Sequence, residues 1–348
     1  MRAAIPDTFR TQRLSSRQIR GTLAGVVTNN CGGKMEGLIQ KLFGFGKSQQ
    51  KAVQAAPTTT SSPASNESEE QDGFFSLEQQ QLLMAQIQRQ TQRKAIRLHP
   101  TKAASPLALT TSKFGGIPYW NPAETYPTNE DGSPLVLLAQ FDCQQLPPLE
   151  GFPKAGLLQF FISNDDAYGL GFDNQMNQKN WRVVYHPVVD ASITQAMVEE
   201  LHLPTTCSEE DSELPFAGEF QLDFELVDTW LGPCSHDDFQ QELQKALVAV
   251  GLPLPPEGTS LYDIFCEDMY NQMADWNEGN WLGGYPYFTQ DDPRFSRPDY
   301  AACTRLLFQM DSSEDILWGD MGVGNFFIAP EDLQQLDFSR VLYTWDCC

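Results

Sequence analysis

Apolar and polar residues alternate strictly in one stretch near the middle of the chain, and this pattern predicts a strand. In residues 220–226 (FQLDFEL) every apolar side chain falls on one face and every polar side chain on the other. Residues 181–186 (WRVVYH) are also rich in strand-forming residues. A strand with one polar face is typical of an antiparallel sheet that has one side in water.

Apolar positions three and four residues apart predict helices elsewhere. Residues 238–250 have this spacing and end at Gly251, a residue type that commonly terminates helices. A shorter helix is predicted over residues 192–201. Helices and strands are segregated along the chain instead of alternating, which predicts the α+β class, with short, mostly antiparallel strands and a few packing helices.

A further helix is predicted to lead into this body over residues 74–100. Ser76 can cap its first turn, and Gln79 completes a capping box three residues later. Patchy apolar positions continue through Leu98, and Pro100 is expected to end the helix.

Three sequence blocks occur twice, in the same order. They are Gly-Gly-x-Pro-Tyr-aromatic within 114–120 and 282–288, Leu-Leu-x-Gln-x-Asp at 137–142 and 306–311, and Gly-x-x-amide-Phe-Phe-Ile within 156–163 and 322–329. One such match could be chance, but three collinear matches are hard to explain that way. We therefore predict an internally duplicated unit, with repeats at about 113–165 and 281–330 and a different segment between them.

The repeats place polar residues at matched positions inside apolar runs. An amide in an apolar strand must find hydrogen-bond partners once it is buried. The matched residues either connect strands or line a shared cleft, and the sequence leaves both interpretations open. As candidate binding residues they are Gln140, Asp142, Gln309, Asp311, Tyr119 and Tyr287.

Together these motifs resemble the YwqG-like family, a bacterial family of unknown biochemical role. The resemblance rests on the Gly-Gly-x-Pro turns, the Leu-Leu-x-Gln-x-Asp strands and the later Trp318-Gly-Asp-Met-Gly322 segment, and it covers about residues 114–341. Tyr126-Pro127 departs from the Trp-Pro usual in such proteins. The resemblance implies a duplicated α+β domain and transfers no catalytic residue.

Charge divides the chain into a basic tail and an acidic body. The formal net charge is −23, of which residues 1–102 contribute +7 (14 basic, 7 acidic) and the remaining residues −30 (9 basic, 39 acidic). We expect a disordered basic tail and Ser/Thr/Pro/Glu-rich linker over residues 1–73 and the body over 101–345. Such a body repels nucleic-acid phosphates and favours a basic protein as partner.

No transmembrane helix is predicted anywhere in the chain. No apolar run approaches the roughly 20 residues needed to cross a bilayer. Residues 35–51 could form a short amphipathic helix that touches a membrane surface, although a loosely ordered lead-in is the simpler interpretation. The composition of residues 1–34 allows a transit peptide, although they contain no clear amphipathic run, and the alternative is a gene start placed upstream of a true start at Met35.

The sequence contains no strong catalytic or metal-binding signature. No two of the eight cysteines have CxxC spacing, and none of the four histidines lies in an HExxH motif. Cys143 with His186 or His236 could form a nucleophile–base pair, and Cys234 with His236 could bind a metal, but we expect no metal site and no cofactor. Without an export signal, reduced cysteines and a cytoplasmic location are expected.

These features favour a non-enzymatic binding protein that neutralises or regulates a basic protein partner. The alternative is a hydrolase or a cation-dependent carbohydrate-active protein that uses a cleft between the two repeats. The alternative is motivated by the amides and acids at matched positions, Gln140 with Gln309 and Asp142 with Asp311.

Overall fold

The computed structural model describes residues 74–207 and 213–347 of the chain. The chain divides into two units at Glu67/Ser68, and the residues described all belong to the second unit. The predictions for the basic tail, the linker, the segment 35–51 and the possible start at Met35 fall outside the described residues.

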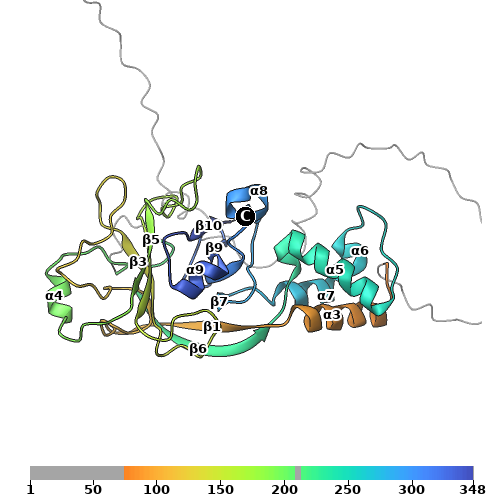
Figure 1. The fold of residues 1–348 in the computed structure, drawn as a ribbon, viewed down its shortest axis with the longest axis horizontal. Helices are drawn as coiled ribbons and strands as arrows, with labels where there is room; N and C mark the ends of the chain where they lie inside the picture. The colour runs from red at the N-terminus through yellow and green to blue at the C-terminus, as the bar shows by residue number, and fades with distance from the viewer. Residues whose placement is uncertain (1–73, 208–212, 348) are drawn as a thin grey trace, which may run out of the picture. The chain divides into compact units, whose positions relative to one another are not determined.

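A curled antiparallel sheet dominates the described residues (Figure 1). Its strands run in the order β10-β9-β8-β7-β1-β6-β2-β3-β4-β5. Their bounds are β1 Arg93–Lys102, β2 Lys113–Gly115, β3 Val136–Asp142, β4 Leu157–Ile162, β5 Trp181–His186, β6 Glu219–Thr229, β7 Asn280–Gly283, β8 Arg305–Asp311, β9 Val323–Ile328 and β10 Leu342–Asp346. The sheet and the accompanying helices confirm the α+β class, and the strands predicted at 181–186 and 220–226 are present as β5 and β6.

Helices flank the sheet. Their bounds are α3 Leu77–Thr91, α4 Gln195–Glu199, α5 His236–Val250, α6 Leu261–Ile264, α7 Glu267–Ala274, α8 Pro293–Ser296 and α9 Pro330–Gln335. Helix α5 confirms the prediction for 238–250 and ends at Gly251 in the left-handed conformation. Helix α4 is shorter than the predicted 192–201, because Thr194 caps it instead of Ser192.

Four of these helices, α3, α5, α6 and α7, share one apolar core, and we call them the helical layer (Figure 1). Phe239 and Leu243 of α5 pack there with Leu83 and Ile87 of α3. Since each of these helices has one apolar stripe, packing the stripes together hides them from water.

The predicted continuation of the first helix through Leu98 is wrong. The capping box of Ser76 and Gln79 is present, but α3 ends at Thr91 and β1 follows. In β1, Ile96 and Leu98 are buried while the residue after each is exposed, which is the period of a strand. Pro100 is tolerated because β7 pairs only with Ala95–Leu98, so the proline lies where β1 has just one neighbouring strand.

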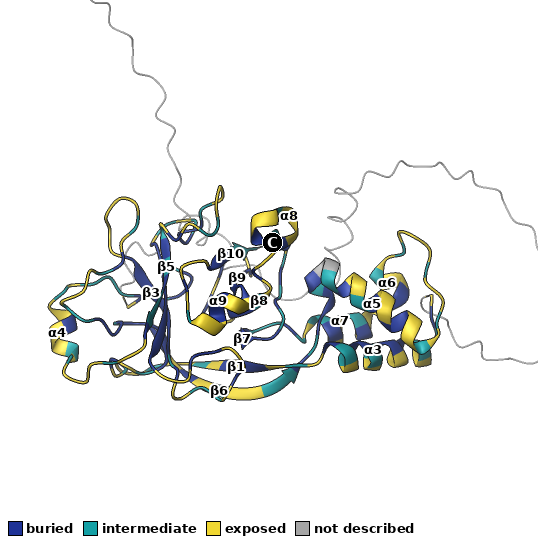
Figure 2. Ribbon diagram, in the orientation of Figure 1, coloured by how far each residue is buried: buried dark blue, intermediate teal, exposed yellow. Residues whose placement is uncertain are grey.

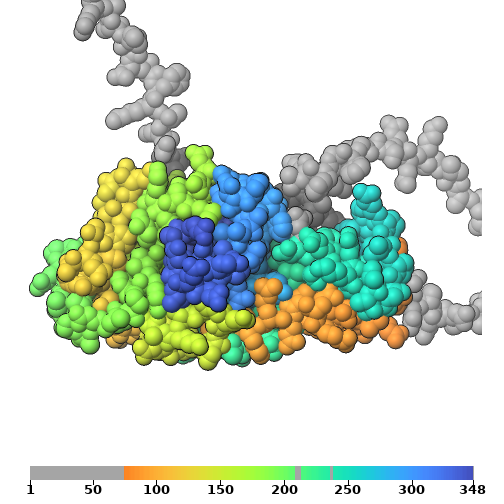
Figure 3. All heavy atoms as spheres, viewed as in Figure 1, coloured from red at the N-terminus to blue at the C-terminus, as the bar shows by residue number. Residues whose placement is uncertain are grey.

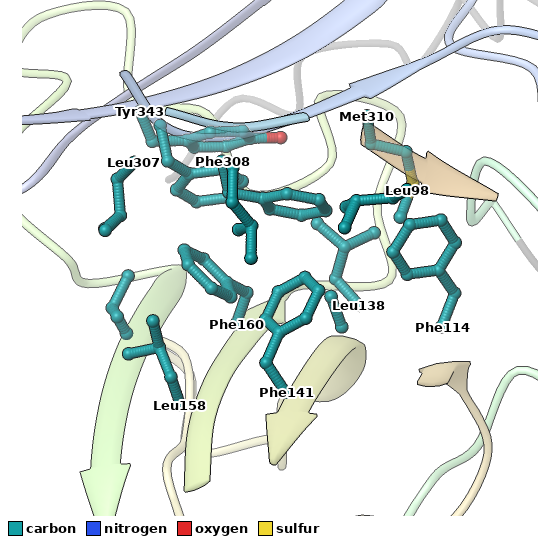
Figure 4. Close-up of a cluster of buried hydrophobic side chains, with 14 of the residues drawn as sticks. Leu98, Phe114, Leu138, Phe141, Leu158, Phe160, Leu307, Phe308, Met310 and Tyr343 are labelled. Atoms are coloured by element: carbon teal, nitrogen blue, oxygen red, sulfur yellow. The ribbon is translucent and has the colours of Figure 1, made fainter. Parts of the chain in front are cut away.

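The central strands are buried on both faces (Figure 2). One face forms an aromatic core in which Phe160 contacts Phe141 and Phe308 at ring-centroid distances of 5.9 and 4.9 Å (Figure 4). The ring of Phe160 also lies 4.9 Å from that of Phe326. The opposite face is covered by two separate clusters. One joins Tyr119 and Trp120 to β3 and β4, and the other joins Phe288 and Tyr300 to β8, β9 and β10. The Gly-Gly-x-Pro-Tyr segments therefore act as covers for the second face of the sheet.

The strand order is the same when read outward from the central β1–β6 pair in either direction. One direction gives β2-β3-β4-β5 and the other β7-β8-β9-β10. Both β3–β4 and β8–β9 contain an irregularity at the same place, between Leu137 and Ala139 and between Leu306 and Phe308. The sequence blocks that recur along the chain thus occupy equivalent places in the sheet.

No helix within residues 74–207 and 213–347 combines the length and the apolar character needed to span a membrane.

Candidate functional site

Gln140, in the middle of β3, is fully buried and makes a complete set of hydrogen bonds. Its Nε2 donates to the carbonyl oxygens of Leu109 (2.9 Å) and Thr111 (3.0 Å). Its Oε1 accepts from the backbone N–H of Tyr119 (3.0 Å) and from Nε2 of Gln159 (2.8 Å). A single amide thus fixes both ends of the first Gly-Gly-x-Pro-Tyr segment onto the sheet.

Gln309, in β8, makes three equivalent bonds in the second half. Its Nε2 donates to the carbonyl oxygens of Asn277 and Gly279, both at 2.8 Å. Its Oε1 accepts from the backbone N–H of Tyr287 at 2.8 Å. Counted back from the first glycine of each Gly-Gly pair, the carbonyls lie at the same two offsets as in the first half. We call each glutamine, together with the backbone groups that it bonds, a clamp. The two clamps use matched atoms of matched residues.

A second amide supports each clamp from the next strand. Gln159 of β4 is opposite Gln140 and donates to the carbonyl oxygen of Tyr119 at 2.8 Å. Asn325 of β9 is opposite Gln309 and donates to the carbonyl oxygen of Tyr287 at 2.9 Å. The paired amides span two strands and one covering segment in both halves.

The two edge strands of the sheet, β5 and β10, carry different residues at the equivalent position beside the clamps. His186 of β5 lies within hydrogen-bond distance of Gln159 Oε1 (2.9 Å), and burial lowers the pKa of the imidazole. The register places Asp346 of β10 where β5 has His186, because their partners Val323 and Leu157 are equivalent. Asp346 accepts the backbone N–H groups of two residues that follow the second Gly-Gly segment, at 3.1 and 2.8 Å.

The two matched aspartates are in different environments. Asp142 accepts the backbone N–H of Gln144 at 3.0 Å at the start of a turn. Asp311 accepts two backbone N–H groups, from Gly279 (2.7 Å) and Ser312 (2.8 Å). Burial raises the pKa of Asp311 to about 6, against the lowering effect of those two bonds. Asp311 can therefore change its charge near neutral pH.

These contacts place the predicted site residues in two separate clamps. Gln140 and Tyr119 belong to the first, and Gln309 and Tyr287 belong to the second. The polar atoms bond mainly to backbone groups of their own half, which is how buried amides are normally satisfied. The geometry favours the connecting role that the sequence left open, and a binding role for these residues stays a prediction.

Cys143 and His186 show no activation in the structure, and the side chain of His236 lies outside what the structure describes. Burial raises the pKa of Cys143 to about 12, whereas a nucleophilic thiol needs a lowered pKa. His186 packs edge-on against the rings of Tyr119 and Trp120, as an apolar core residue does. In the described part of the chain, no three His, Cys, Asp or Glu side chains are arranged to hold a metal ion.

A charged pocket lies beside the second Gly-Gly turn. It has a volume of about 350 Å³, and we call it the turn pocket. The lining residues that matter here are Arg93, Asp238, Glu242, Gly284, Tyr285 and Arg294.

This pocket was not predicted from the sequence. Arg93 lies within the helix predicted over residues 74–100. One signal was available, because Tyr285 occupies the variable position of Gly-Gly-x-Pro where the first copy has the apolar Ile117. A polar ring at the single variable position of a repeated turn marks a local difference in function or packing.

The fold and the clamps define an α+β protein built on one curled antiparallel sheet with two matched halves. Residues 112–347 match the family described as a domain of unknown function (DUF1963). Because the match covers more than half of the chain, the protein belongs to this family. No curated protein is similar enough to match the sequence.

Proposed function

We propose that this protein is a non-enzymatic binding protein that engages a basic protein through its acidic surface. The supporting observation is the charge of the described residues. They carry 37 acidic side chains against 14 basic ones, a net charge of −23. A surface of this kind attracts basic partners over distances longer than a contact and raises their rate of association.

The helical layer is the part of the surface best suited to this role. From residue 233 to residue 279 the chain has nine acidic residues and a single basic one, Lys245. Side chains of Glu267, Asp268 and Asp275 are exposed on and just after α7. This region forms the green-to-teal part of the surface in Figure 3.

Aromatic side chains accompany these acids. Tyr262 is 51% exposed, and its ring lies 4.2 Å from the ring of Tyr270 on α7. Aromatic residues supply much of the binding energy in protein interfaces, while surrounding charges select the partner. We therefore place the contact with the basic partner on α6 and α7.

The test compares two variants that have the same change in charge. The first reverses Glu267, Asp268 and Asp275 to Lys, and the control reverses Glu150, Glu199 and Glu200, which are also exposed but lie outside the helical layer. Immobilised wild type and control should retain a Lys/Arg-rich protein at low salt and release it at high salt, while the first variant should not retain it. Equal retention by both variants, or none by the wild type, would contradict the proposal.

We also propose that the two halves arose by duplication and that the family is the YwqG-like one. The support is the matched strand order, the matched irregularities at Leu137/Ala139 and Leu306/Phe308, and the two clamps with equivalent bonds. The six cysteines among the described residues are all free, which agrees with the proposed cytoplasmic location.

The alternative function, a hydrolase or a cation-dependent carbohydrate-active protein, remains a prediction with less support. Its motivating residues, Gln140 and Gln309, bond to the backbone of their own halves. Melting curves with calcium, magnesium, manganese and zinc address it directly, because an ion that binds the folded protein raises its melting temperature. A higher melting temperature with one of these ions would support the alternative function.

A further inference from the structure

The turn pocket carries opposite charges on separate elements of the fold. Arg93 comes from β1, while Asp238 and Glu242 come from α5. This arrangement is unusual in a protein with so few basic groups, and it does not follow from the repeat motifs.

Arg93 is held firmly at one side of the pocket. Its guanidinium carbon lies 3.6 Å from the centroid of the Tyr285 ring, and its Nη1 donates to the carbonyl oxygen of Gly284 at 3.4 Å. The hydroxyl of Tyr285 donates in turn to the carbonyl oxygen of Thr91 at 2.7 Å. The cation is therefore positioned before any ligand arrives, which reduces the entropic cost of binding.

The charge of Arg93 has no counter-ion among the side chains that the structure describes. Arg294, the other cation of the pocket, is different, because its Nε donates to both carboxylate oxygens of the buried Asp292 at 2.9 and 3.0 Å. Nearby Arg305 also responds to Arg93, since burial and then repulsion by Arg93 lower the pKa of Arg305. The positive charge of Arg93 is therefore not neutralised by an ion pair among the described side chains.

The acidic side of the pocket belongs to α5. Glu242 Oε2 accepts from Gln90 Nε2 of α3 at 2.8 Å, and Glu242 Oε1 accepts from Nζ of the exposed Lys245 at 2.6 Å. Burial raises the pKa of Tyr285, Arg93 lowers it, and Glu242 and Asp238 raise it further. The phenol thus experiences both signs of charge.

We propose that the turn pocket binds a small zwitterion, a free amino acid or a dipeptide. Its carboxylate pairs with the guanidinium of Arg93, and its ammonium lies against Asp238 and Glu242. A simple anion would be repelled by the acids and a simple cation by the arginine, so a ligand with both charges fits the pocket best. A volume of about 350 Å³ suits a molecule of this size. This site is separate from the proposed contact on α6 and α7, so either can fail without the other.

The test uses the full chain and matched sets of ligands. The twenty amino acids and a panel of dipeptides are screened by thermal shift, and each positive is compared with its N-acetyl form and its decarboxylated amine. At least one free zwitterion should raise the melting temperature, and both analogues should bind about tenfold more weakly or worse. No shift with any zwitterion would overturn the proposal, as would equal binding of an analogue that lacks one charge.

Two substitutions locate the site. Arg93→Gln should weaken binding about tenfold or more, while Lys94→Gln, the same charge change on the neighbouring exposed residue, should leave it unchanged. If Arg93→Gln lowers folding stability too far, Glu242→Gln replaces it and should reduce the preference for the free amine over the N-acetyl form. Equal affinities for Arg93→Gln and Lys94→Gln, or an unchanged preference in Glu242→Gln, would overturn the assignment.

Discussion

Gln140 and Gln309 each hold one Gly-Gly turn against the sheet through several buried hydrogen bonds. Each is fully buried and bonds to backbone groups before and after a Gly-Gly turn, so it connects its own strand to both sides of a turn that lies more than 20 residues earlier in the chain. Removing such a side chain leaves several buried backbone groups without partners, and each of those groups retains its full desolvation cost.

Replacing Gln140 by Leu should therefore lower the free energy of unfolding by about 3 kcal/mol. Gln309→Leu should have a similar effect, because its three bonds to the backbone are equivalent to those of Gln140. Gln144→Leu is the matched control, since Gln144 is exposed, and it should change stability by less than about 0.5 kcal/mol. Urea denaturation measures all three, and a loss below about 1 kcal/mol at Gln140 would show that its bonds are not needed.

Asp311 makes a prediction about pH. Its folded-state pKa is about 6, above its ordinary value of 3.8, so between these values the folded protein holds a proton that the unfolded chain releases. Its contribution to stability is present below pH 3.8 and is lost as pH rises through 6.

The stability difference between wild type and Asp311→Asn should consequently decrease by about 2 kcal/mol from pH 4 to pH 7. The asparagine does not titrate, although it also loses one of the two backbone N–H bonds at every pH. Denaturation at several pH values gives the slope. A difference that is constant with pH would place the pKa of Asp311 near its ordinary value.

At the scale of elements, the sequence predicted those parts whose periodicity was local. Helix α5, strands β5 and β6 and the capping box of α3 could be found because each is encoded within one short stretch. The end of α3 could not be placed, because it depends on distant partners. Thr91 at that end bonds to Leu231 and Tyr285, which lie far along the chain.

The strand character of β1 was nevertheless visible in the sequence, since Ile96 and Leu98 alternate with charged or polar neighbours. A proline at position 100 made a helix end look more natural than a strand. The strand tolerates this proline because β7 pairs with β1 only from Ala95 to Leu98, and no local sequence pattern encodes where that pairing ends.

The candidate site was predicted in part. The repeat matches identified Gln140 and Gln309 as special positions, but they did not say what those side chains bond to. The turn pocket was missed entirely, because Arg93 and Glu242 come together only when the helical layer packs beside the second turn.

The second Gly-Gly turn itself can be tested by substitution. Gly284 has a φ of +79°, and a Cβ there would lie 2.9 Å from the Cβ of Ala95 and 3.0 Å from the Cγ2 of Thr229. Gly132 has a similar φ of +83° with nothing within 4 Å, so it isolates the cost of the backbone conformation. Gly132→Ala should cost about 1 kcal/mol of stability, and Gly284→Ala should cost clearly more, about 2–4 kcal/mol.

Comparing the two variants separates the cost of the left-handed backbone conformation from the cost of steric crowding around the added Cβ. Equal losses in both glycine variants, measured by thermal or urea unfolding, would mean that the strand–turn contact at Gly284 relaxes freely. A larger loss at Gly284 would support close packing of the turn against β1 and β6.

For the molecule as a whole, the decisive property is the excess of negative charge on its surface. The net charge of −23 on the described residues is a property of a surface whose basic groups are mostly paired or stacked, such as Lys94 with Asp228 and Arg97 over Trp281. Charge of one sign at this density destabilises the compact state by self-repulsion, and a basic partner relieves that repulsion.

The most direct test of this account is the difference in retention between the two charge-reversal variants. With Glu267, Asp268 and Asp275 changed to Lys, we predict loss of a salt-sensitive, Lys/Arg-rich partner that the wild type retains. With Glu150, Glu199 and Glu200 changed instead, we predict that the partner is retained. Loss in both variants, or in neither, would contradict a binding surface on α6 and α7.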